Sequence, residues 1–308
     1  MLVECVPNFI EGRDPRPVDQ IAKVIGQVEG VHVLDTHMDP DHHRSVITFV
    51  GPGGSVEEAA VRAAGEASLL IDLNRHRGEH PRIGATDVIP FVPLKGVTLS
   101  DCAAIARRAG KQIWDRYQIP VYFYEAAALR QERRHLANIR RGGFESLKEI
   151  IANDPSRWPD VGEPRLHPSA GATAVGARGL LIAFNVNLRT NDLEIARAIA
   201  RTVRASGGGL PAVKALGILL QSRSIGGHPG QAQVSMNLTD WKRTSVREAF
   251  EAVKEQAARR SVAIQSSEIV GLVPAEALCG ATTSELSLTG FGPEKILENR
   301  LADVVREN

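Results

Sequence analysis

The sequence predicts an α/β (α+β) protein made of two similar sandwiches, each with helices packed on a sheet. Each half of the chain gives strand, helix, strand, strand, helix, strand in that order. This order is the split β-α-β arrangement of ferredoxin-like folds. The first strand of each half also ends near an asparagine that precedes a polar turn, in CVPNF from Cys5 and in FNVNL from Phe184. We therefore expect two related subdomains with a ligand between them.

The first half alternates apolar strands with amphipathic helices. Apolar residues at helical spacing from Val18 to Val28 indicate a helix after a polar turn at residues 8–13. Ser55 with Glu58 three residues later predicts a capping box that opens the second helix. Strands are predicted at residues 2–6, 31–35, 44–50, 88–92 and 121–124, and helices at 18–28, 55–73, 100–117 and 132–151.

A change of composition separates the halves. Residues 154–173 carry four prolines without periodicity, and residues 162–176 are interpreted as a glycine–proline loop. Strands are then predicted at residues 180–188, 213–220, 232–238 and 264–272, with helices at 192–205 and 244–257. We expect an N-terminal subdomain at 1–176, a C-terminal subdomain at 177–290 and a tail at 291–308.

The composition indicates an ordinary globular protein of the cytoplasm. With 308 residues, 43% hydrophobic residues and a net charge of +1, the chain has no electrostatic signature of nucleic-acid or membrane binding. No apolar run approaches the roughly 20 residues of a membrane helix, and the N-terminus does not have the pattern of a signal peptide. Three widely spaced cysteines are typical of a reducing compartment.

The stretch that organises the chain is RHRGEHPRIGATDVIPFVP at residues 75–93. His80 lies between Glu79 and Pro81, and the proline favours an extended backbone at His80. A titratable side chain with a neighbouring carboxylate and the Arg82 cation suits acid–base chemistry on an anionic substrate. The alternative is an ordinary histidine in a loop, and the residues alone leave both interpretations open.

The segment DPDHHRS at residues 39–45 is interpreted as a charged hairpin turn. The adjacent His42 and His43 point in opposite directions on an extended backbone, which disfavours a shared metal ion. If this turn lies beside the organising stretch, Asp39 and Arg44 are candidates to hold the carboxylates and amine of an amino-acid substrate.

Asn185 and Asn187 alternate with apolar residues, so both face the same side of their strand. Amides suit hydrogen bonding to a heterocycle, whereas the simpler interpretation is a solvated strand face. Ser235 and Asn237 repeat the pattern on a later strand. The sequence has no GxGxxG, Walker or GxSxG motif, so nucleotide binding and serine hydrolysis are unsupported.

With these segments in view, the chain resembles the glutamate formimidoyltransferase (formiminotransferase) family in a stand-alone form without the cyclodeaminase domain. The resemblance covers about residues 2–275 and is carried by LVECVPNF, DHHRSVITFVG, RHRGEHPRIGATDVIPFVPL, LLIAFNVNL and SSEIVGLVP. It implies two ferredoxin-like subdomains packed around a folate-lined substrate tunnel, and a homodimer. The implied reaction of histidine breakdown transfers a formimidoyl group from N-formimidoyl-L-glutamate to tetrahydrofolate. Tetrahydrofolate is then a co-substrate of one-carbon metabolism, and no metal is expected.

The resemblance also assigns residues. His80 is the implied catalytic base, with Glu79 as a group that orients it, while Arg44 and Arg82 are expected to hold substrate carboxylates. A histidine at position 43, where the family usually has asparagine, leaves the role of that position open. The alternatives are formyl transfer from N-formyl-L-glutamate, transfer to water, or a folate-binding module without catalysis. Folate contacts are implied at Gly162, Glu163, Pro164, Arg165, Leu166, His167, Pro168, Ser169, Ala170, Gly171, Asn185 and Asn187.

Overall fold

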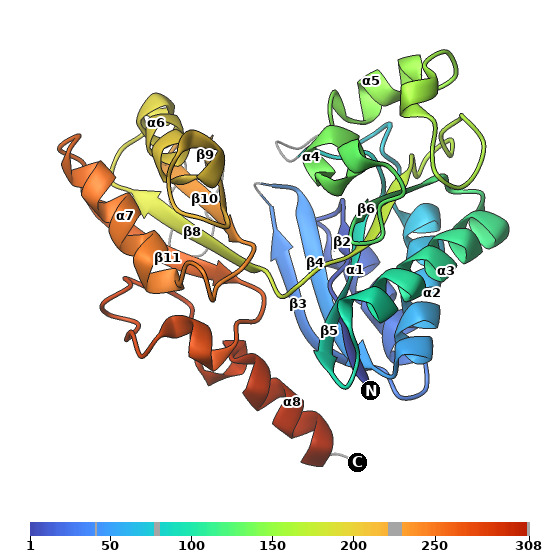
Figure 1. Ribbon diagram of the computed structural model, residues 1–308, viewed down its shortest axis with the longest axis horizontal. Helices are drawn as coiled ribbons and strands as arrows, with labels where there is room; N and C mark the ends of the chain where they lie inside the picture. Colours follow the sequence, from blue (N-terminus) through green and yellow to red (C-terminus); the bar gives the residue numbers. More distant parts are fainter. Residues whose placement is uncertain (41, 77–80, 221–229, 307–308) are drawn as a thin grey trace. The chain divides into compact units, whose positions relative to one another are not determined.

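The computed structural model describes residues 1–40, 42–76, 81–220 and 230–306 (Figure 1). The chain divides into two compact units, Met1–Gly179 and Leu180–Asn308. Each unit has its own sheet and its own apolar core. The mixed α/β class predicted from the sequence is confirmed. Among the helices of the described residues, none combines the length and the apolar content that a bilayer span requires.

The first unit is built on a seven-stranded sheet. Strand β3 lies beside β4, followed by β1 and β2 together, then β5, β7 and β6. All pairings among β1 to β5 are antiparallel, whereas β7 is parallel to both β5 and β6. The strands are β1 (Leu2–Cys5), β2 (Asn8–Phe9), β3 (His32–Asp39), β4 (Arg44–Gly51), β5 (Thr86–Lys95), β6 (Val121–Glu125) and β7 (Thr173–Ala177).

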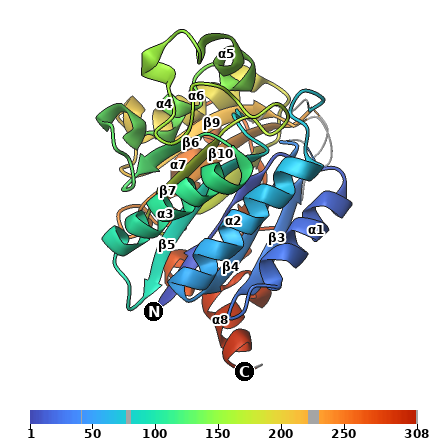
Figure 2. The same cartoon turned by 90° about the vertical axis from the view of Figure 1, so that its right-hand side faces the viewer.

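Helices cover both faces of this sheet. The helices α1 (Pro15–Gly26), α2 (Gly53–Leu70) and α3 (Leu99–Tyr117) lie together on one face (Figure 2). Their apolar sides pack on Phe9, Phe49 and Phe91 of the strands. On the opposite face, α4 (Leu136–Ile139) and α5 (Gly143–Ile150) pack over β6 and β7 through a separate cluster. The edge of the sheet at β6 and β7 is therefore buried on both sides.

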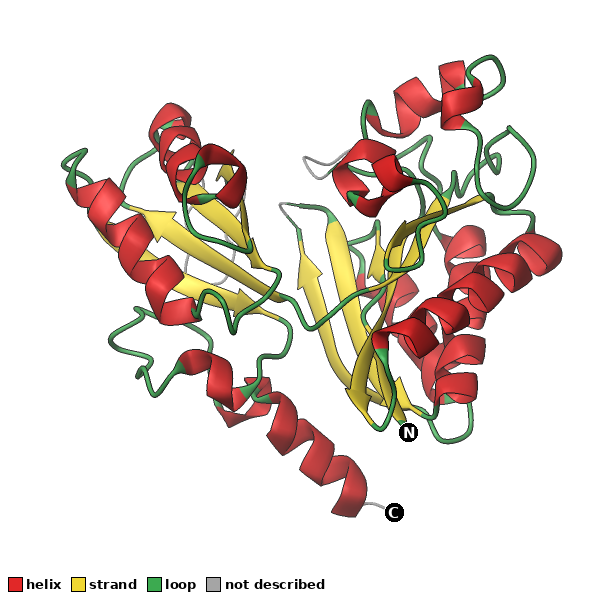
Figure 3. Ribbon diagram, in the orientation of Figure 1, coloured by secondary structure: helices red, strands yellow, loops and turns green. Residues whose placement is uncertain are grey.

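The second unit has a four-stranded antiparallel sheet in the order β11, β8, β10, β9. Its strands are β8 (Ile182–Leu188), β9 (Val213–Leu219), β10 (Ala232–Leu238) and β11 (Ile264–Val270). Figure 3 shows α6 (Leu193–Val203) and α7 (Val246–Ala258) on one face of this sheet. Phe184, Val186 and Phe250 lie in the core between the helices and the sheet. The chain ends in α8 (Leu297–Arg306).

Short 3-10 helices connect the larger elements. They are η1 (Gln131–Arg134), η2 (Pro155–Arg157), η3 (Ala205–Gly207), η4 (Ala275–Leu278) and η5 (Pro293–Lys295). In both units four strands and two helices follow one another as a β-α-β-β-α-β motif. The fourth strand of the motif lies beside the first, so that the order across the sheet is fourth, first, third, second. This is the ferredoxin-like arrangement that the sequence predicts for each half.

Several predicted boundaries were wrong. The second helix begins at Gly53 after Pro52, so Ser55 lies within its first turn and caps nothing. Capping boxes instead open α3 at Thr98 and α7 at Ser245. The predicted turn at residues 8–13 contains β2, and the predicted helix at 132–151 is interrupted at Gly142, whose φ of +80° ends α-helical geometry.

The strand β7 was missed, because residues 162–176 were interpreted wholly as a loop. Its sequence, TAVGA, consists of small residues without a run of large apolar side chains. A small residue is required at Gly176, where an added Cβ would lie 2.5 Å from the ring of Tyr124. Because β7 packs closely against its neighbour and needs small residues, it lacks the run of large apolar side chains by which strands are recognised in a sequence.

Candidate active site

The organising stretch is hydrogen-bonded at residues 83–85 to the end of the predicted folate loop. Ala85 donates its backbone N–H to the carbonyl of Ala170 at 2.9 Å, and Ala172 donates to the carbonyl of Ile83 at 2.9 Å. At Gly84 an added Cβ would lie 1.7 Å from the carbonyl oxygen of Ala172, so only glycine allows this approach. Two segments predicted separately from the sequence thus lie side by side.

Arg82 crosses from this stretch to α5. Its guanidinium Nη2 donates to Glu145 Oε1 at 2.7 Å and to the carbonyl of His76 at 3.2 Å. The Arg82 side chain is buried, whereas more than half of the Glu145 side chain is exposed. Glu145 is therefore a partner that another carboxylate, arriving from solvent, could replace.

A buried ion pair fixes the start of β5. Asp87 is fully buried, accepts from the backbone N–H of Ile83 at 2.8 Å, and pairs with the guanidinium Nη2 of Arg140. Arg140 follows directly after α4. The pair ties the organising stretch to the helical layer over β6 and β7.

Arg44 lies in the same charged cluster. It is the register partner of Asp39 across β3 and β4. Loss of hydration and, to a smaller extent, the charge of Arg140 lower the pKa of Arg44 to about 10, although Asp39 and Asp87 oppose the shift. Arg44 is still a cation at neutral pH, and two arginines share a poorly hydrated region. Such a region favours the binding of a carboxylate.

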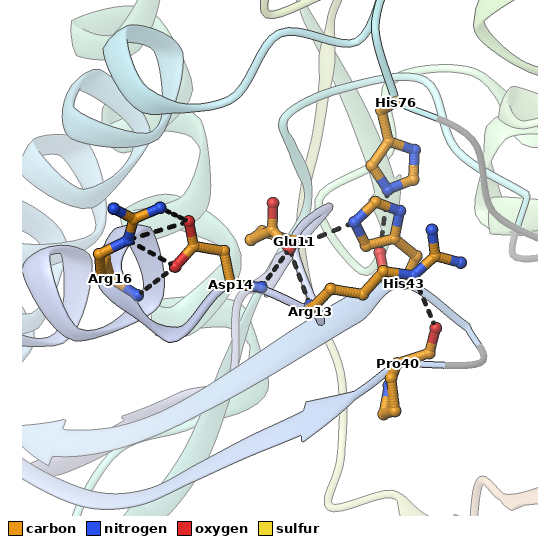
Figure 4. Close-up of polar contacts among 7 residues, drawn as sticks. All are labelled: Glu11, Arg13, Asp14, Arg16, Pro40, His43 and His76. Carbon is orange, nitrogen blue, oxygen red and sulfur yellow. Dashed lines mark hydrogen bonds and ion pairs between the residues drawn. The ribbon is translucent and has the colours of Figure 1, made fainter. Parts of the chain in front are cut away.

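Beside this cluster lies a group of three side chains, Glu11, His43 and His76, in which the two histidine rings are stacked (Figure 4). The rings of His43 and His76 are stacked with centroids 3.8 Å apart. His43 Nε2 lies 3.2 Å from Glu11 Oε1, and His76 Nε2 lies 3.1 Å from the His43 carbonyl. His43 has a φ of +49°, a left-handed conformation that a histidine adopts only at a cost. The group therefore holds the backbone directly before Arg44.

The members of this group differ in charge at neutral pH. Burial alone would raise the pKa of Glu11, but hydrogen bonds with His43 and with the N–H groups of Asp14 and Arg13 hold it at about 2. Burial and, to a smaller extent, the neighbouring His43 lower the pKa of His76 to about 4. At neutral pH, Glu11 is therefore a carboxylate and His76 a neutral imidazole.

The predicted folate loop is ordered by its own histidine. Nδ1 of His167 accepts from the N–H groups of Ala170 at 3.0 Å and Ser169 at 3.4 Å. Burial lowers the pKa of His167, in keeping with a neutral ring that accepts at Nδ1. Gly171 has a φ of +69° and closes the loop. The segment is thus a fixed turn with its own hydrogen bonds.

A cavity of about 180 Å³ lies between this loop and α5. Apolar side chains and the cation of Lys148 contribute to its wall. Lys148 Nζ donates to Asn74 Oδ1 at 3.0 Å, and Asn74 Nδ2 donates to the carbonyl of Pro168 at 2.9 Å. The cavity is lined by Phe144, Lys148, Ile151, Ala152, Pro164, Arg165, Leu166, His167 and Pro168.

In the second unit, Asn185 and Asn187 face away from the helices, as predicted, but they are buried. The interpretation of a solvated strand face is therefore wrong. Asn185 Nδ2 donates to Glu268 Oε1 at 2.9 Å, and Asn187 Nδ2 donates to Ser266 Oγ at 3.0 Å. The two amides belong to a polar network on one face of the sheet.

Other predicted residues have different outcomes. His80 and Glu79 lie outside the described residues. His42 and His43 contact different carboxylates, since His42 Nδ1 lies 3.3 Å from Asp39 Oδ2 and His43 contacts Glu11. Over the described parts of the chain, no group of three or more histidine, cysteine, aspartate or glutamate side chains is arranged to hold a metal ion.

The sequence reasoning missed several residues of this region. Arg140 and Glu145 lie within the predicted helix at residues 132–151, and Glu11 lies within the predicted turn at residues 8–13, and neither segment was assigned a function. Gln233 and Glu268 lie on predicted strands, where the alternation that singled out Asn185 also applies to them. Reading all strands of the second half for polar residues on one face is the signal that would have found this pair.

Comparison with known proteins finds family matches in both halves of the chain. The N-terminal subdomain of the formiminotransferase domain matches residues 2–178, and the formiminotransferase domain matches residues 183–286. A glutamate formimidoyltransferase of Thermoplasma acidophilum is 46% identical over 97% of this chain and 97% of its own length. The glutamate formimidoyltransferase of Streptococcus pyogenes serotype M1 is 43% identical over 97% and 98%. The formimidoyltransferase-cyclodeaminase of Mus musculus is 40% identical over 91% of this chain and 51% of its own length. The chain therefore belongs to the formiminotransferase family.

Proposed function

We propose that this chain transfers the formimidoyl group of N-formimidoyl-L-glutamate to tetrahydrofolate, giving 5-formimidoyltetrahydrofolate and L-glutamate. The observation that carries the proposal is the match, over 97% of the chain, to two relatives named glutamate formimidoyltransferase. The proposal includes a cytoplasmic homodimer that acts in histidine breakdown and one-carbon metabolism, with tetrahydrofolate as co-substrate and without a metal.

The reaction needs a carrier for one proton. The secondary amine of the reduced pterin forms a bond to the amidine carbon and loses a proton. The bond between that carbon and the glutamate nitrogen then breaks as the nitrogen takes up a proton. We assign the proton transfer to His80, as the family resemblance implies, because an imidazole of ordinary pKa near 6.5 is suited to it at neutral pH. Glu79 is assigned the orientation of that ring.

The two carboxylates of the donor have candidate partners in the first unit. Arg44 is supported by its position beside Asp39 and Arg140 in a poorly hydrated region. For Arg82, a substrate carboxylate would take the place of the exposed Glu145. Asp39 is assigned to the nitrogen of the donor. Fixing the donor in this way contributes to rate because proximity and orientation supply roughly 7–11 kcal/mol in well-oriented reactions.

Part of the folate is assigned to the loop of residues 162–171. The cavity beside the loop offers apolar side chains for an aromatic ring and Lys148 for an anionic tail. Its volume of about 180 Å³ is below the roughly 300 Å³ of a typical small-molecule pocket, so it suits a portion of the molecule.

A turnover assay tests the proposal. The purified chain is supplied with N-formimidoyl-L-glutamate or N-formyl-L-glutamate, each with and without tetrahydrofolate. Release of glutamate only from the formimidoyl donor with tetrahydrofolate present supports the proposal. Turnover of the formyl donor, release without tetrahydrofolate, or binding without turnover would each establish one of the alternatives.

Substitution His80→Ala tests the assigned base. Loss of a general base lowers turnover by about 10²–10⁴-fold. Binding of a reduced folate, measured by calorimetry, should be preserved because the imidazole is assigned to chemistry. Near-normal turnover in this variant would remove His80 from the mechanism.

A further inference from the structure

The turn before α1 packs directly on the β3–β4 hairpin that carries Asp39 and Arg44. At Gly12, an added Cβ would lie 2.3 Å from the carbonyl oxygen of Asp39 and 2.4 Å from the backbone nitrogen of Arg44. Both atoms belong to the backbone, so a side chain at position 12 would displace the hairpin. The neighbouring Arg13 donates from Nε to the carbonyl of Pro40 at 3.2 Å (Figure 4). The turn therefore fixes the backbone of two residues that are assigned to the donor substrate.

Glu11 supplies the charged contact between the turn and the hairpin. Its Oε1 accepts from the backbone N–H groups of Arg13 at 2.8 Å and Asp14 at 3.0 Å, within the turn itself. The same oxygen lies 3.2 Å from His43 Nε2 in the hairpin. Although burial opposes the shift, hydrogen bonds hold the pKa of Glu11 at about 2. At neutral pH this carboxylate carries no proton, so His43 is the donor in a charge-assisted hydrogen bond.

This contact maintains an unfavourable backbone conformation at His43. The φ of +49° is left-handed, and a bulky side chain rarely adopts it. Such a conformation persists only where the surrounding contacts determine it, and it occurs often at functional sites. Glu11 holds one nitrogen of the His43 ring, and the ring of His76 is stacked on its face with centroids 3.8 Å apart. Because His43 directly precedes Arg44, these contacts determine the direction in which β4 begins.

The same group of side chains is connected to Arg82. His76 Nε2 lies 3.1 Å from the carbonyl oxygen of His43, and the imidazole is the donor because a carbonyl can only accept. The carbonyl of His76 in turn accepts from Arg82 Nη2 at 3.2 Å. His43, His76 and Arg82 are all buried, so water competes little for these hydrogen bonds. A series of contacts that starts at Glu11 therefore reaches both Arg44 and Arg82.

We propose that Glu11 is a positioning residue for the donor substrate, acting through His43 and His76 on the two arginines that hold the donor carboxylates. The inference rests on the proposed function, which assigns Arg44 and Arg82 to N-formimidoyl-L-glutamate. Glu11 does not bind the donor itself, because its negative charge repels the carboxylates of the donor. Arginines that are already held in place lose less conformational freedom when the donor binds. The effect of Glu11 is therefore on affinity for the donor.

Substitution Glu11→Gln in the full chain tests the proposal. The amide keeps an oxygen for the N–H groups of Arg13 and Asp14, so the start of α1 is preserved, while the charge that attracts His43 is removed. A charge-assisted hydrogen bond is roughly twice as strong as a neutral one, so Kd and KM for the donor should rise by about 3- to 10-fold. Because only binding is affected, kcat and KM for tetrahydrofolate should stay within about 2-fold of the wild type.

Asp14→Asn is the matched control. Asp14 belongs to the same turn, where it accepts from the backbone N–H of Arg16 at 3.0 Å and pairs with the exposed side chain of Arg16. Asparagine caps a helix as well as aspartate does, so affinity for the donor should be unchanged.

His43→Phe provides a second, independent test. Phenylalanine keeps a ring for stacking on His76 but removes the group that donates to Glu11. In this background Glu11→Gln should have little further effect on affinity for the donor, because the contact is already lost. Additive effects of the two substitutions would mean that Glu11 does not act through His43, and the proposal would be overturned.

Calorimetry of donor binding and steady-state turnover are measured on every variant. An unchanged Kd for the donor in Glu11→Gln, or an equal loss of affinity for tetrahydrofolate, would overturn the proposal. Failure of the proposed function is a separate result, in which the wild type binds the donor in a Glu11-dependent manner but releases no glutamate when tetrahydrofolate is present. A wild type that does not bind the donor would overturn both.

Discussion

The two units follow the same chain path but hold their buried charges differently. In both, a β-α-β-β-α-β motif orders the strands as fourth, first, third, second. The first unit adds β7 and β6 beside β5, together with α4 and α5 over them. In the described part of the second unit no further strand joins the sheet, and the face opposite α6 and α7 carries rows of polar side chains. The added layer in the first unit supplies the arginine that neutralises a strand carboxylate.

Asp87 and Glu268 illustrate the difference. Asp87 is buried against the guanidinium of Arg140 and a backbone N–H. Glu268 is buried against the side-chain amides of Asn185 and Gln233. The ion pair cancels the charge of Asp87 locally. This pair is therefore expected to serve the stability of the first unit.

The largest expected effect is that of Asp87→Asn. The amide retains an oxygen for the N–H of Ile83 but leaves Arg140 without its counter-charge. Breaking a buried pair costs about 3–5 kcal/mol. Chemical denaturation, with hydrogen exchange of β5 and β8 amides, should show weakened protection in the first unit alone. An equal loss in both units, or no loss, would contradict a stabilising role of the Asp87–Arg140 pair in the first unit.

Glu4→Gln is expected to have a smaller effect that depends on pH. Glu4 lies on β1, and burial raises its pKa to about 7 although the charge of Arg178 opposes the shift. A carboxyl with a raised pKa in the folded state stabilises it fully below the unfolded value near 4.5, and this contribution is lost as the pH rises to about 7. The variant should therefore be more stable than wild type at pH 8, by on the order of 1–3 kcal/mol, and equal at pH 4.

Thermal unfolding at several pH values measures this effect. Glu58→Gln is the control, because Glu58 pairs with Arg62 and Arg116 at the surface, where such pairs are worth about 0–1 kcal/mol. A Glu4→Gln variant that is destabilised at pH 8 would show that the Glu4 carboxylate is better solvated or paired than its burial indicates.

The shared motif was predictable from the sequence because it depends on local periodicity. Alternation of apolar residues indicated most strands, and helical spacing indicated the helices that cover each sheet. The same alternation placed Asn185 and Asn187 on one face. Strand β7 carries no such pattern, since its small residues are selected by contact with β6, as at Gly176 under Tyr124.

The site was predictable only where its residues are close in sequence. Asp39 and Arg44 flank one turn, and their pairing could be inferred. Asp87 and Arg140 are 53 positions apart, and Arg82 and Glu145 are 63 apart. Such contacts depend on how α4 and α5 pack over the sheet. The partners of Glu268 depend in the same way on strand register, which periodicity does not determine.

The smallest expected effect at neutral pH, and a direct probe of the first unit, is that of His76→Phe. Phenylalanine preserves an aromatic face for stacking on His43 but removes the hydrogen bond to the His43 carbonyl, which is worth about 1 kcal/mol at neutral pH.

The effect of His76 on stability also depends on pH. Burial lowers the pKa of His76 to about 4, so the stabilising effect of the neutral ring is complete above the unfolded value near 6.5 and is lost as the pH falls to 4. Within this window the wild type should lose stability faster than the variant, by at most about 1.4 kcal/mol per pH unit. Hydrogen exchange at pH 7 and pH 4.5 should show this difference in β3 and β4 but not in β8 and β10, because the substituted residue belongs to the first unit. Parallel pH profiles for the two proteins would mean that His76 accepts a proton in the folded state as readily as in the unfolded chain, and the stacked pair would then have no part in the acid sensitivity of the first unit.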